Sequence, residues 1–551
     1  MIETNSLISS TGTAPAGRHY NVAIAGFGPV GATLAGLLGR AGLSVRVHEK
    51  SQEIYPQPRA VGFDQDAMRI FQHIGIAEAL APFVAPFRDG VYYGVEGQMI
   101  QRVRRIAPPY PLTWDPNYTC DQPGLESVLR EALSRVPHVS ISLGRELTDF
   151  EERDHRVHLR STDAAGNVFH DTADYLVACD GASSPVRRKL GITLESMDYD
   201  EPWIVVDVIV NEDSIGRLPT TNVQYCQPER PSSFITCPGN HRRWEFMTLP
   251  GEPDAGVIPE ERLWRLLSRW LKPDQARIWR AAAYRFHALI ADQWRSGRVL
   301  LAGDSAHQTP PFLGQGMCQG LRDVGNLAWK LEKVIRGVAP QALLDTYMQE
   351  RRPHVVETTR MAKAFGCIIS ERDPQKARER DARMLGTGAD GQPGEPKTLY
   401  RQDLIPGLAH GLISTRAPLA GKVFPQPRVS RAGATPMLMD DLAAPDWRLV
   451  LGARAALPWS EAFIVLARKH GVQPIIVGDA GMPRRAGVIA VAESEGLLQG
   501  WFETHRCAGA LVRPDFYVFG TFDSMDAAAY LLDEWAAASR EESVAAPALN
   551  T

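Results

Sequence analysis

The amino-acid sequence predicts several α/β domains, and three observations support this fold class. The chain has 551 residues, whereas a single hydrophobic core stops growing at roughly 250–300 residues. Residues 22–39 carry no charged side chain and contain closely spaced glycines. Strand-like and helix-like stretches alternate near the start of the chain and again from residue 447 onward, which is typical of α/β domains.

The composition is that of an ordinary globular protein. Lys and Arg number 60 against 64 Asp and Glu, and 44% of the residues are hydrophobic. These values argue against a disordered, collagen-like or nucleic-acid-coating chain. The seven cysteines are scattered and include no C-x-x-C pair. We therefore expect neither a disulfide framework nor a metal site, but free thiols in a reducing compartment, the cytoplasm.

The uncharged run at residues 22–39 is close to the roughly 20 residues that a membrane span needs. A Gly-x-Gly-Pro turn interrupts it early, and no basic residue comes before Arg18, so neither a span nor a signal peptide is favoured. The pattern instead predicts a strand over 21–25, a glycine turn, a helix to Arg40, and a strand over 44–48 that ends at Glu49. This βαβ unit would be buried on all sides, which explains its low polarity.

The turn of this unit carries the pattern G-x-G-x-x-G at Gly26, Gly28 and Gly31. The first glycine permits a tight turn, the second lets the backbone approach a pyrophosphate, and the third allows close packing of helix on strand. Glu49 follows at the end of the next strand, where a carboxylate binds ribose hydroxyls. The pattern predicts dinucleotide binding and leaves FAD and NAD both open.

The remaining elements suggest three domains. A helix over 124–135, a hairpin over 157–170, apolar strands over 175–179 and 298–302, and a long helical region to about 370 extend the first domain, whereas 200–290 is rich in β-type runs. We expect the following organisation: 1–19 a loose arm, 20–200 with 291–370 the nucleotide-binding domain, 201–290 an interleaved β-sheet substrate domain, 371–440 an irregular linker, and 441–540 a C-terminal α/β domain.

Two further motifs follow predicted strands. One runs into Asp180-Gly181, where Ser183 or Ser184 could cap a helix; by itself it is also a common loop. The other runs into Gly303-Asp304 and continues through Pro310 to Gly316. An acid at the end of a buried strand is costly without a partner, and a ligand hydroxyl would supply one. The alternative is an ordinary helix entry in which Asp304 shapes the turn.

The three motifs in this order resemble the flavoprotein aromatic hydroxylases of the para-hydroxybenzoate hydroxylase and phenol hydroxylase group, over about residues 20–365. Segments 58–69, 203–207, 243–252 and 323–330 are most similar to members that act on 3-(3-hydroxyphenyl)propionate. The resemblance implies a Rossmann-like FAD-binding domain. The region around 511–518 is similar to a C-terminal thioredoxin-like domain; without C-x-x-C, it implies a structural or oligomeric role.

The resemblance also implies functions for individual residues. Asp180 matches an acid that contacts FAD and nicotinamide, Asp304 an acid that binds the flavin ribitol, and Gln122 a glutamine that contacts the cofactor's linker. The full set of implied cofactor-binding residues is Gly26, Gly28, Gly31, Glu49, Lys50, Arg59, Gln122, Asp180, Gly181, Gly303, Asp304, Gly314, Gln315 and Gly316. The catalytic candidates are Asp64, Pro311, Tyr225 and His287. For Tyr225, His287 and also His307, an ordinary packing or surface role is the favoured alternative.

The implied activity is hydroxylation of a phenolic compound, most closely an aromatic acid like 3-(3-hydroxyphenyl)propionate. NADH or NADPH reduces FAD, and O2 then reacts to give a C4a-hydroperoxyflavin. No second G-x-G-x-x-G is visible, which fits a coenzyme that binds without its own Rossmann domain. We expect a small aromatic substrate and a homodimer, with no nucleic-acid partner and no membrane span. A larger polycyclic or heteroaromatic substrate, or a non-catalytic flavin-binding protein, are the alternatives.

Overall fold

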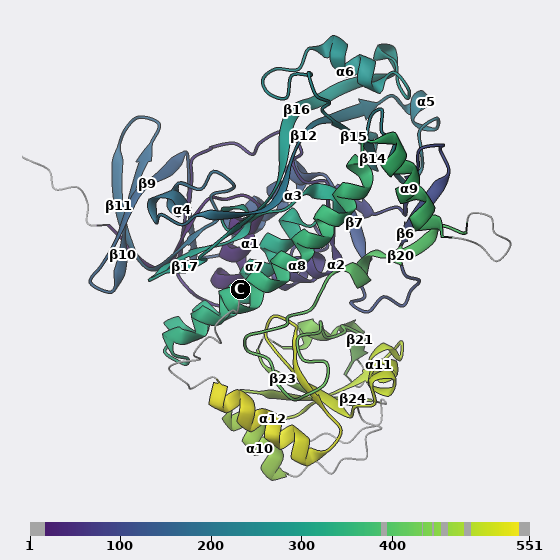
Figure 1. Cartoon of the computed structure of the whole chain (residues 1–551). Helices are drawn as coiled ribbons and strands as arrows, with labels where there is room; N and C mark the ends of the chain where they lie inside the picture. Colours follow the sequence, from purple (N-terminus) through teal and green to yellow (C-terminus); the bar gives the residue numbers. More distant parts are fainter. Residues whose placement is uncertain are drawn as a thin grey trace, which may run out of the picture.

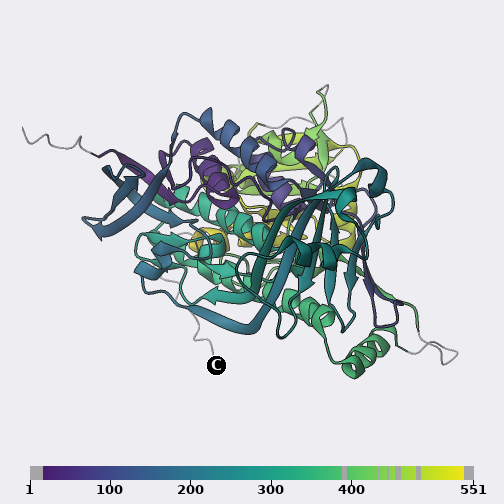
Figure 2. The ribbon, with the colours of Figure 1, turned by 90° about the horizontal axis from the view of Figure 1, so that it is seen from above.

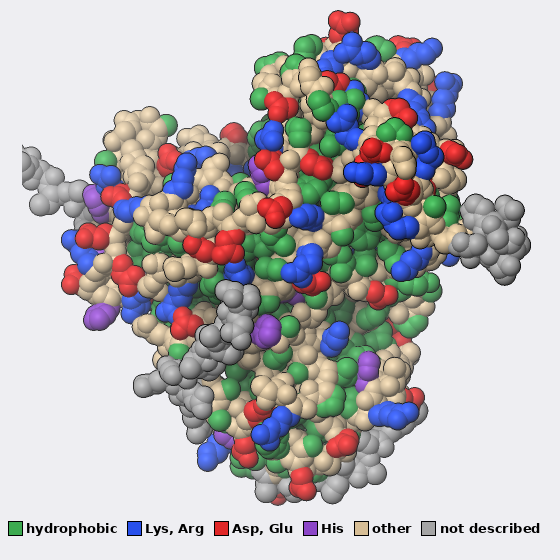
Figure 3. Space-filling model, viewed as in Figure 1, with side chains coloured by type: hydrophobic (Ala, Val, Ile, Leu, Met, Phe, Trp, Pro, Cys, Tyr) green, Lys and Arg blue, Asp and Glu red, His purple; other side chains and the backbone are tan. Residues whose placement is uncertain are grey.

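The computed structural model describes residues 17–386, 394–431, 434–443, 446–452, 461–478 and 486–538. Figure 1 shows a mixed α/β molecule in which a C-terminal domain, green to yellow, packs beneath a larger body. Lys, Arg, Asp and Glu side chains are interspersed over the face seen in Figure 3, in keeping with the near-balanced charge of the sequence.

The first sheet is built on the predicted βαβ unit, which is confirmed: β1 (His19–Ala25), α1 (Pro29–Arg40) and β2 (Val45–Glu49). The main path of the sheet runs β17-β18-β11-β1-β2-β8, and its strands from β18 to β8 are parallel. The added strands are β8 (Val139–Leu143), β11 (Val168–Ala178), β17 (Arg295–Ser296) and β18 (Val299–Leu301). Among the described residues no helix is long and apolar enough to cross a membrane.

Helices cover this sheet, and a β-ribbon extends it. Besides α1, these helices are α2 (Gln65–His73), α3 (Gln122–Ser134), α4 (Pro185–Lys189), α7 (Gly316–Ile335) and α8 (Asp345–Ser370). The ribbon adds β9 (Arg145–Arg153) and β10 (Arg156–Asp163) to β11. Helix α7 lies so close to α1 that a Cβ on Gly320 would stand 2.6 Å from the side chain of Val30. A small sheet of β3 (Gly62–Asp64), β4 (Val84–Pro86) and β7 (Asn117–Cys120) lies beside α2 and α3.

The second sheet has nine strands in the order β19-β16-β12-β15-β14-β13-β5-β6-β20, and Figure 2 shows its teal strands beside the purple first unit. Its members are β5 (Gly90–Tyr93), β6 (Met99–Arg104), β12 (Leu194–Val210), β13 (Asn222–Tyr225), β14 (Ser232–Thr236), β15 (His241–Met247), β16 (Ala276–Ala291), β19 (His307–Gln308) and β20 (Lys397–Tyr400). The expected range 201–290 is therefore too narrow, because three distant segments pair with it.

The two faces of this sheet have different environments. One face, which carries Ile204, Phe234 and Trp244, is buried beneath α6 (Glu260–Leu267), with α5 (Glu212–Ile215) nearby. The opposite face, which we call the inner face, carries Trp203, Val205 and Asp207 on β12, and His241, Arg243, Glu245 and Met247 on β15. Trp203 on this face packs against Phe312, with ring centroids 5.5 Å apart. The inner face is therefore turned toward the loop that follows the Gly303-Asp304 motif.

The expected linker at 371–440 is not an independent segment. It contains α9 (Pro374–Leu385), β20, β21 (Arg428–Ser430) and β22 (Met437–Leu438). β20 pairs with β6 in the nine-stranded sheet, whereas β21 pairs with β25 in the C-terminal sheet. The Pro, Gly and Arg content that suggested a linker reflects short elements shared between two sheets.

The C-terminal domain is a seven-stranded sheet with helices. Its elements are β23 (Arg448–Gly452), α10 (Glu461–Lys469), β24 (Gln473–Gly478), β25 (Ile489–Glu493), α11 (Leu497–His505), β26 (Gly509–Val512), β27 (Val518–Phe522) and α12 (Met525–Ala538). The central order is β24-β23-β26-β27, with the first pair parallel and the others antiparallel. This is the arrangement of a thioredoxin-like core.

Candidate functional site

The three sequence motifs meet at one edge of the first sheet, because each follows the carboxyl end of a parallel strand. Cys179 N donates to Ala25 O at 2.8 Å, and Ala302 N donates to Ala178 O at 3.0 Å. These two bonds tie the Gly26 turn, the Asp180-Gly181 turn and the Gly303-Asp304 turn side by side. In open parallel sheets this edge is where ligands bind.

The glycine turn leaves room for a ligand at one position only. Gly26 has φ +95°, and a Cβ there would lie 2.4 Å from the carbonyl oxygen of Cys179. A Cβ on Gly31 would lie 2.2 Å from Gly26 O. Gly28, in contrast, has no atom within 4 Å of such a Cβ, and it stands at the N-terminus of α1. This open space at a helix N-terminus suits a pyrophosphate.

Glu49 is fixed at the end of β2 by two backbone donors. Its Oε2 accepts from Phe27 N and its Oε1 from Ser51 N, both at 2.8 Å. The carboxylate is thus held beside the glycine turn, where ribose hydroxyls would lie. The neighbouring Lys50 is exposed.

Gln122, which the sequence predicted as a cofactor contact, supports the loop at 58–60. Its Oε1 accepts from Arg59 N at 3.1 Å and Ala60 N at 2.6 Å, while its Nε2 donates to Glu126. The Arg59 side chain is exposed, and its charge acts on Asp304. Arg59 therefore faces the same space as the acid of the third motif.

A buried ionic cluster that the sequence analysis missed holds this loop from the sheet side. Asp207 of β12 pairs with Arg243 at 2.7 Å and Arg280 at 3.4 Å, and is fully buried. Arg243 donates to the carbonyls of Pro58 and Arg59 at 2.9 and 2.7 Å. Burial would raise the pKa of Asp207, but Arg243 holds it at about 2. The one available signal was an aspartate within the apolar run of β12.

The second motif is held to the third by Arg187, another residue that the sequence analysis did not single out. Its guanidinium donates to Ala182 O and Ser305 O, both at 2.9 Å. Asp180 Oδ2 accepts from Val186 N at 3.2 Å, whereas its buried Oδ1 has no hydrogen-bond partner among the described residues. Gly181 has φ +81°. Asp180 thus shapes its own loop and retains one oxygen for a ligand.

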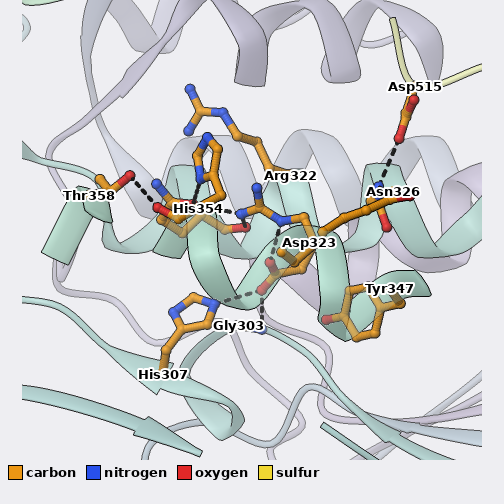
Figure 4. A network of polar contacts seen from close by, with 12 residues as sticks. Gly303, His307, Arg322, Asp323, Asn326, Tyr347, His354, Thr358 and Asp515 are labelled. Carbon is orange, nitrogen blue, oxygen red and sulfur yellow. Dashed lines mark hydrogen bonds and ion pairs between the residues drawn. The ribbon is translucent and has the colours of Figure 1, made fainter. Parts of the chain in front are cut away.

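Asp304 projects from a turn that α7 supports from behind. Gly303 N donates to Asp323 Oδ2 at 3.0 Å, and Asp323 also binds His307 at 2.7 Å (Figure 4). Arg351 binds the other oxygen of Asp323 at 2.9 Å. The Asp304 carboxylate is solvent-accessible and forms no hydrogen bond or ion pair with any described residue. The protein around Asp304 partly desolvates its carboxylate, which raises the pKa of Asp304. His307 belongs to this buried support and does not reach the ligand space.

The loop that follows is a short 3₁₀ turn, Pro311–Leu313, which ends at Gly314 with φ +60°. Gln315 is buried and bonds inward: Nε2 donates to Asp64 at 3.0 Å and Oε1 accepts from Arg322 at 2.9 Å. Pro311 is half-buried. Gln315 therefore positions the loop through its side chain, and any ligand contact would come from the backbone.

Asp64 does not have the geometry of a group that activates a phenol. It caps α2 by accepting from Ala67 N at 3.1 Å, and it binds Gln315 and Arg322. Burial would raise its pKa, but Arg322 lowers it. Its oxygens are engaged by protein donors, so its role here is to position the neighbouring loop.

Tyr225 and His287 lie away from this space and are corrected as catalytic candidates. Tyr225 points to the far face of the sheet, where Trp270 donates to its hydroxyl at 3.2 Å. His287 follows Phe286, which is buried with Trp203 on the inner face, so His287 points to the opposite face. Its Nδ1 lies 3.5 Å from Oδ1 of the exposed Asp200. The period of two along a strand decides both cases, because neighbouring residues face opposite sides.

A dinucleotide cofactor fits the residues present. The empty space over Gly28, the fixed carboxylate of Glu49, the free oxygen of Asp180 and the unpartnered Asp304 lie along one sheet edge. Among the described residues no cluster of His, Cys, Asp or Glu could hold a metal ion.

Two family profiles match the chain. The FAD binding domain family matches residues 19–362, and the HcaD C-terminal domain family matches residues 421–537. The probable NADH-specific resorcinol 4-hydroxylase of Rhodococcus jostii is 36% identical over 92% of both chains. The 3-(3-hydroxy-phenyl)propionate/3-hydroxycinnamic acid hydroxylase of Burkholderia cenocepacia is 33% identical over 95% of this chain and 98% of the relative.

Solved structures share the fold. The flavin-dependent monooxygenase PieE, solved with FAD and substrate, superposes with a TM-score of 0.76 over 95% of this chain and 99% of the other, at 21% identity.

Proposed function

Because the chain belongs to the FAD-dependent aromatic hydroxylases, we propose that it hydroxylates a single-ring phenol with a second substituent meta to the hydroxyl. The observation that carries this proposal is the near full-length similarity to two relatives. One is named for resorcinol and the other for 3-(3-hydroxyphenyl)propionate and 3-hydroxycinnamic acid. All three compounds are meta-substituted phenols, and the similarity includes the sheet that faces the FAD site.

In this proposal the ring lies between the inner face of the nine-stranded sheet and the loops at 58–60 and 311–316. FAD supplies the reducing and oxygen-activating chemistry when bound, with NAD(P)H and O2 as co-substrates. The protein orients the ring and excludes bulk water. Aromatic side chains support the apolar part of this wall: Trp203 stacks on Phe286 at 5.5 Å, and Phe312 lies across both rings.

An aromatic acid of the 3-(3-hydroxyphenyl)propionate type is our first choice of substrate. Arg401 supports this choice, because no ion pair joins it to a carboxylate of the described residues and its Nε forms no hydrogen bond. It donates to Leu313 O and lies over Phe87, with its Cζ 4.5 Å from the ring centroid. Its charge also reaches Tyr92 on the inner face. A substrate carboxylate would satisfy this cation.

The test is product formation by the purified holoenzyme. The panel is 3-(3-hydroxyphenyl)propionate, 3-hydroxycinnamate, resorcinol, 4-hydroxybenzoate and a polycyclic phenol, each scored by product mass and by oxidation of NADH and NADPH. We expect hydroxylated product from the meta-substituted phenols, with NADH preferred as in the name of one relative. Product only from the polycyclic phenol, or coenzyme oxidation without product from any compound, would contradict the proposal.

The role of Arg401 has its own test. Arg401→Met removes the charge while keeping an extended apolar stem. Hydrogen bonds to charged groups contribute about 1.5–3 kcal/mol, so the ratio of kcat/KM for the propionate to kcat/KM for resorcinol should fall roughly ten- to hundredfold. An unchanged ratio would exclude Arg401 as the carboxylate partner and favour a neutral substrate.

We also propose that the protein is a homodimer and that it lies in the cytoplasm. Use of NADH or NADPH supports an intracellular location. Light scattering on the purified holoenzyme would distinguish a monomer from a dimer.

A further inference from the structure

One buried carboxyl on the inner face has no role in the architecture described above. Glu245 stands in the middle of β15 and is only 5% exposed. It lies opposite Val205 on β12 and Ser233 on β14. No hydrogen bond or ion pair connects its carboxyl group to any described residue. A buried carboxyl without a partner is costly for folding unless something else offsets the cost.

Glu245 lies on β15 between the residues that support the two loops at the FAD site, 58–60 and 311–313. Two residues before it, Arg243 grips the carbonyls of Pro58 and Arg59. Two residues after it, Met247 lies opposite Trp203, which packs against Phe312. Because residues two apart on a strand are about 7 Å apart on the same face, Glu245 lies between the supports of the 58–60 and 311–313 loops.

The neighbouring side chains leave the Glu245 carboxyl available. Ser233 donates its hydroxyl proton to Gln224 Oε1 at 2.5 Å, and not to Glu245. Arg243 is committed to Asp207 and to the loop carbonyls. The strip that crosses strands β13, β14 and β15 therefore contains an amide, a hydroxyl and a carboxyl. The amide and the hydroxyl bind each other, whereas the carboxyl binds no residue in the part of the chain that the structure describes.

The charges around Glu245 come from its own strand and from β12. Arg243 lowers its pKa and Asp207 raises it, while β14 contributes no charged group at this position. The further cation of the cluster, Arg280 on β16, is paired with Asp207. Burial is the largest influence, and it raises the pKa of Glu245 to about 7. Such a carboxyl exchanges a proton near neutral pH, where a general base is most effective.

We propose that Glu245 binds the phenolic hydroxyl of the substrate and takes its proton, a role that rests on the proposed function. The O–H bond of the phenol breaks, the proton moves to a carboxylate oxygen of Glu245, and the electron pair stays on the phenolic oxygen. The resulting phenolate is electron-rich at the ring carbons ortho and para to that oxygen, where hydroxylation takes place. The hydroxyl in turn gives the buried carboxyl its missing partner.

The first test compares Glu245→Gln with the wild-type holoenzyme, on a phenol that the wild type hydroxylates. The amide keeps the shape but accepts no proton, so kcat/KM should fall roughly hundred- to ten-thousandfold. The wild-type kcat/KM should rise with pH through about 7, and this step should be absent in the variant. Glu261→Gln, an exposed residue of α6 behind the same sheet, is the matched control. An unaltered rate and pH profile in Glu245→Gln would overturn the proposal.

A second measurement uses only wild-type protein and needs no turnover. Oxidised holoenzyme is titrated with the phenol and with its methyl ether between pH 5.5 and 8.5, an interval of roughly 1.5 units on either side of the Glu245 pKa of about 7. The phenol should bind more tightly as Glu245 ionises, at least threefold over this interval, whereas the ether should not. Equal pH dependence for both compounds would overturn the proposal even if Glu245→Gln does not fold. If the wild type hydroxylates no meta-substituted phenol, the proposed function fails separately, and any phenol that still binds tests Glu245.

Discussion

At the scale of single residues, the site is marked by polar groups that the protein leaves unsatisfied. Buried polar groups are normally hydrogen-bonded, so the unpaired Oδ1 of Asp180 indicates where a ligand would complete the structure. Asp304 is solvent-accessible and has no partner among the described residues, so its carboxylate is open to a ligand hydroxyl. Neighbouring acids such as Asp323 and Asp64 are fully paired and act as supports.

Asp304→Ala should weaken FAD binding without unfolding the domain. The Asp304 side chain has no described protein partner to lose, but its hydrogen bonds to a ligand hydroxyl would be lost, which predicts roughly ten- to hundredfold weaker binding. Flavin fluorescence during dialysis measures this loss. Asp213→Ala, at an exposed position on α5, is the control. Full flavin retention in Asp304→Ala would remove this residue from the cofactor site.

At the scale of elements, the glycine turn separates a folding requirement from a binding requirement. A Cβ on Gly26 would meet the backbone of Cys179, and the positive φ adds strain. A Cβ on Gly28 would meet no protein atom. Replacing glycine by alanine therefore tests folding at Gly26 and cofactor binding at Gly28.

We expect Gly26→Ala to destabilise the fold by several kcal/mol, in the range of other strained or overpacked sites, and to lower the yield of folded protein. Gly28→Ala should fold with a Tm close to that of wild-type apoprotein but bind FAD more weakly, because its methyl group occupies the pyrophosphate space. Thermal unfolding of the apoproteins and FAD titration distinguish the two. Equal effects of both substitutions on the apoprotein would contradict this division.

The ionic cluster on β12, β15 and β16 makes stability depend on acid pH. Asp207 has a folded-state pKa of about 2, below its unfolded value of 3.8. Its contribution, roughly 2 kcal/mol, is therefore complete above pH 4 and is lost as the pH falls from about 4 to about 2. Asp207→Asn should be less stable at neutral pH, because Arg243 and Arg280 lose their carboxylate, and should lose this part of the acid slope. Urea unfolding at stepped pH measures both; a parallel slope in the variant would contradict the assignment.

At the scale of the whole molecule, a buried network joins the C-terminal domain to the FAD domain. Glu350 of α8 binds Lys330 of α7 at 2.7 Å and Arg513, which follows β26, at 2.6 Å, and all three side chains are fully buried. Asn326 links the same group to Asp515 (Figure 4). The C-terminal domain therefore completes the support of α7, the helix that holds the Gly303 turn through Asp323.

Glu350→Gln should destabilise both domains together by roughly 3–5 kcal/mol, because it leaves Lys330 and Arg513 without this buried carboxylate. Glu357→Gln on the same helix breaks only a solvent-exposed pair with Arg360 and should cost at most about 1 kcal/mol. Calorimetry of the holoenzymes should show one lowered transition for Glu350→Gln. A separate early transition with full flavin retention would mean that the domains are not coupled.

The sequence alone determined the parts of this protein that local chemistry dictates. The glycine spacing, the strand before it and Glu49 after it define the nucleotide-binding unit, because turn geometry and strand period act over a few residues. The order of the three motifs was enough to indicate a flavoprotein aromatic hydroxylase, which the comparisons confirm.

Only the tertiary structure decided which face each strand residue presents and which acids remain free. Tyr225 and His287 lie on the face of the sheet that points away from the site, and Asp64 is paired with Arg322. Glu245, in the segment 243–252, is buried on the inner face and has no partner among the described residues. A one-residue step reverses the face of a strand, and ion pairs such as Arg322–Asp64 join residues more than 250 positions apart. Neither relation has a local signature in the sequence. The residues that face the substrate space are therefore determined only by the pairing of the strands in the assembled sheet.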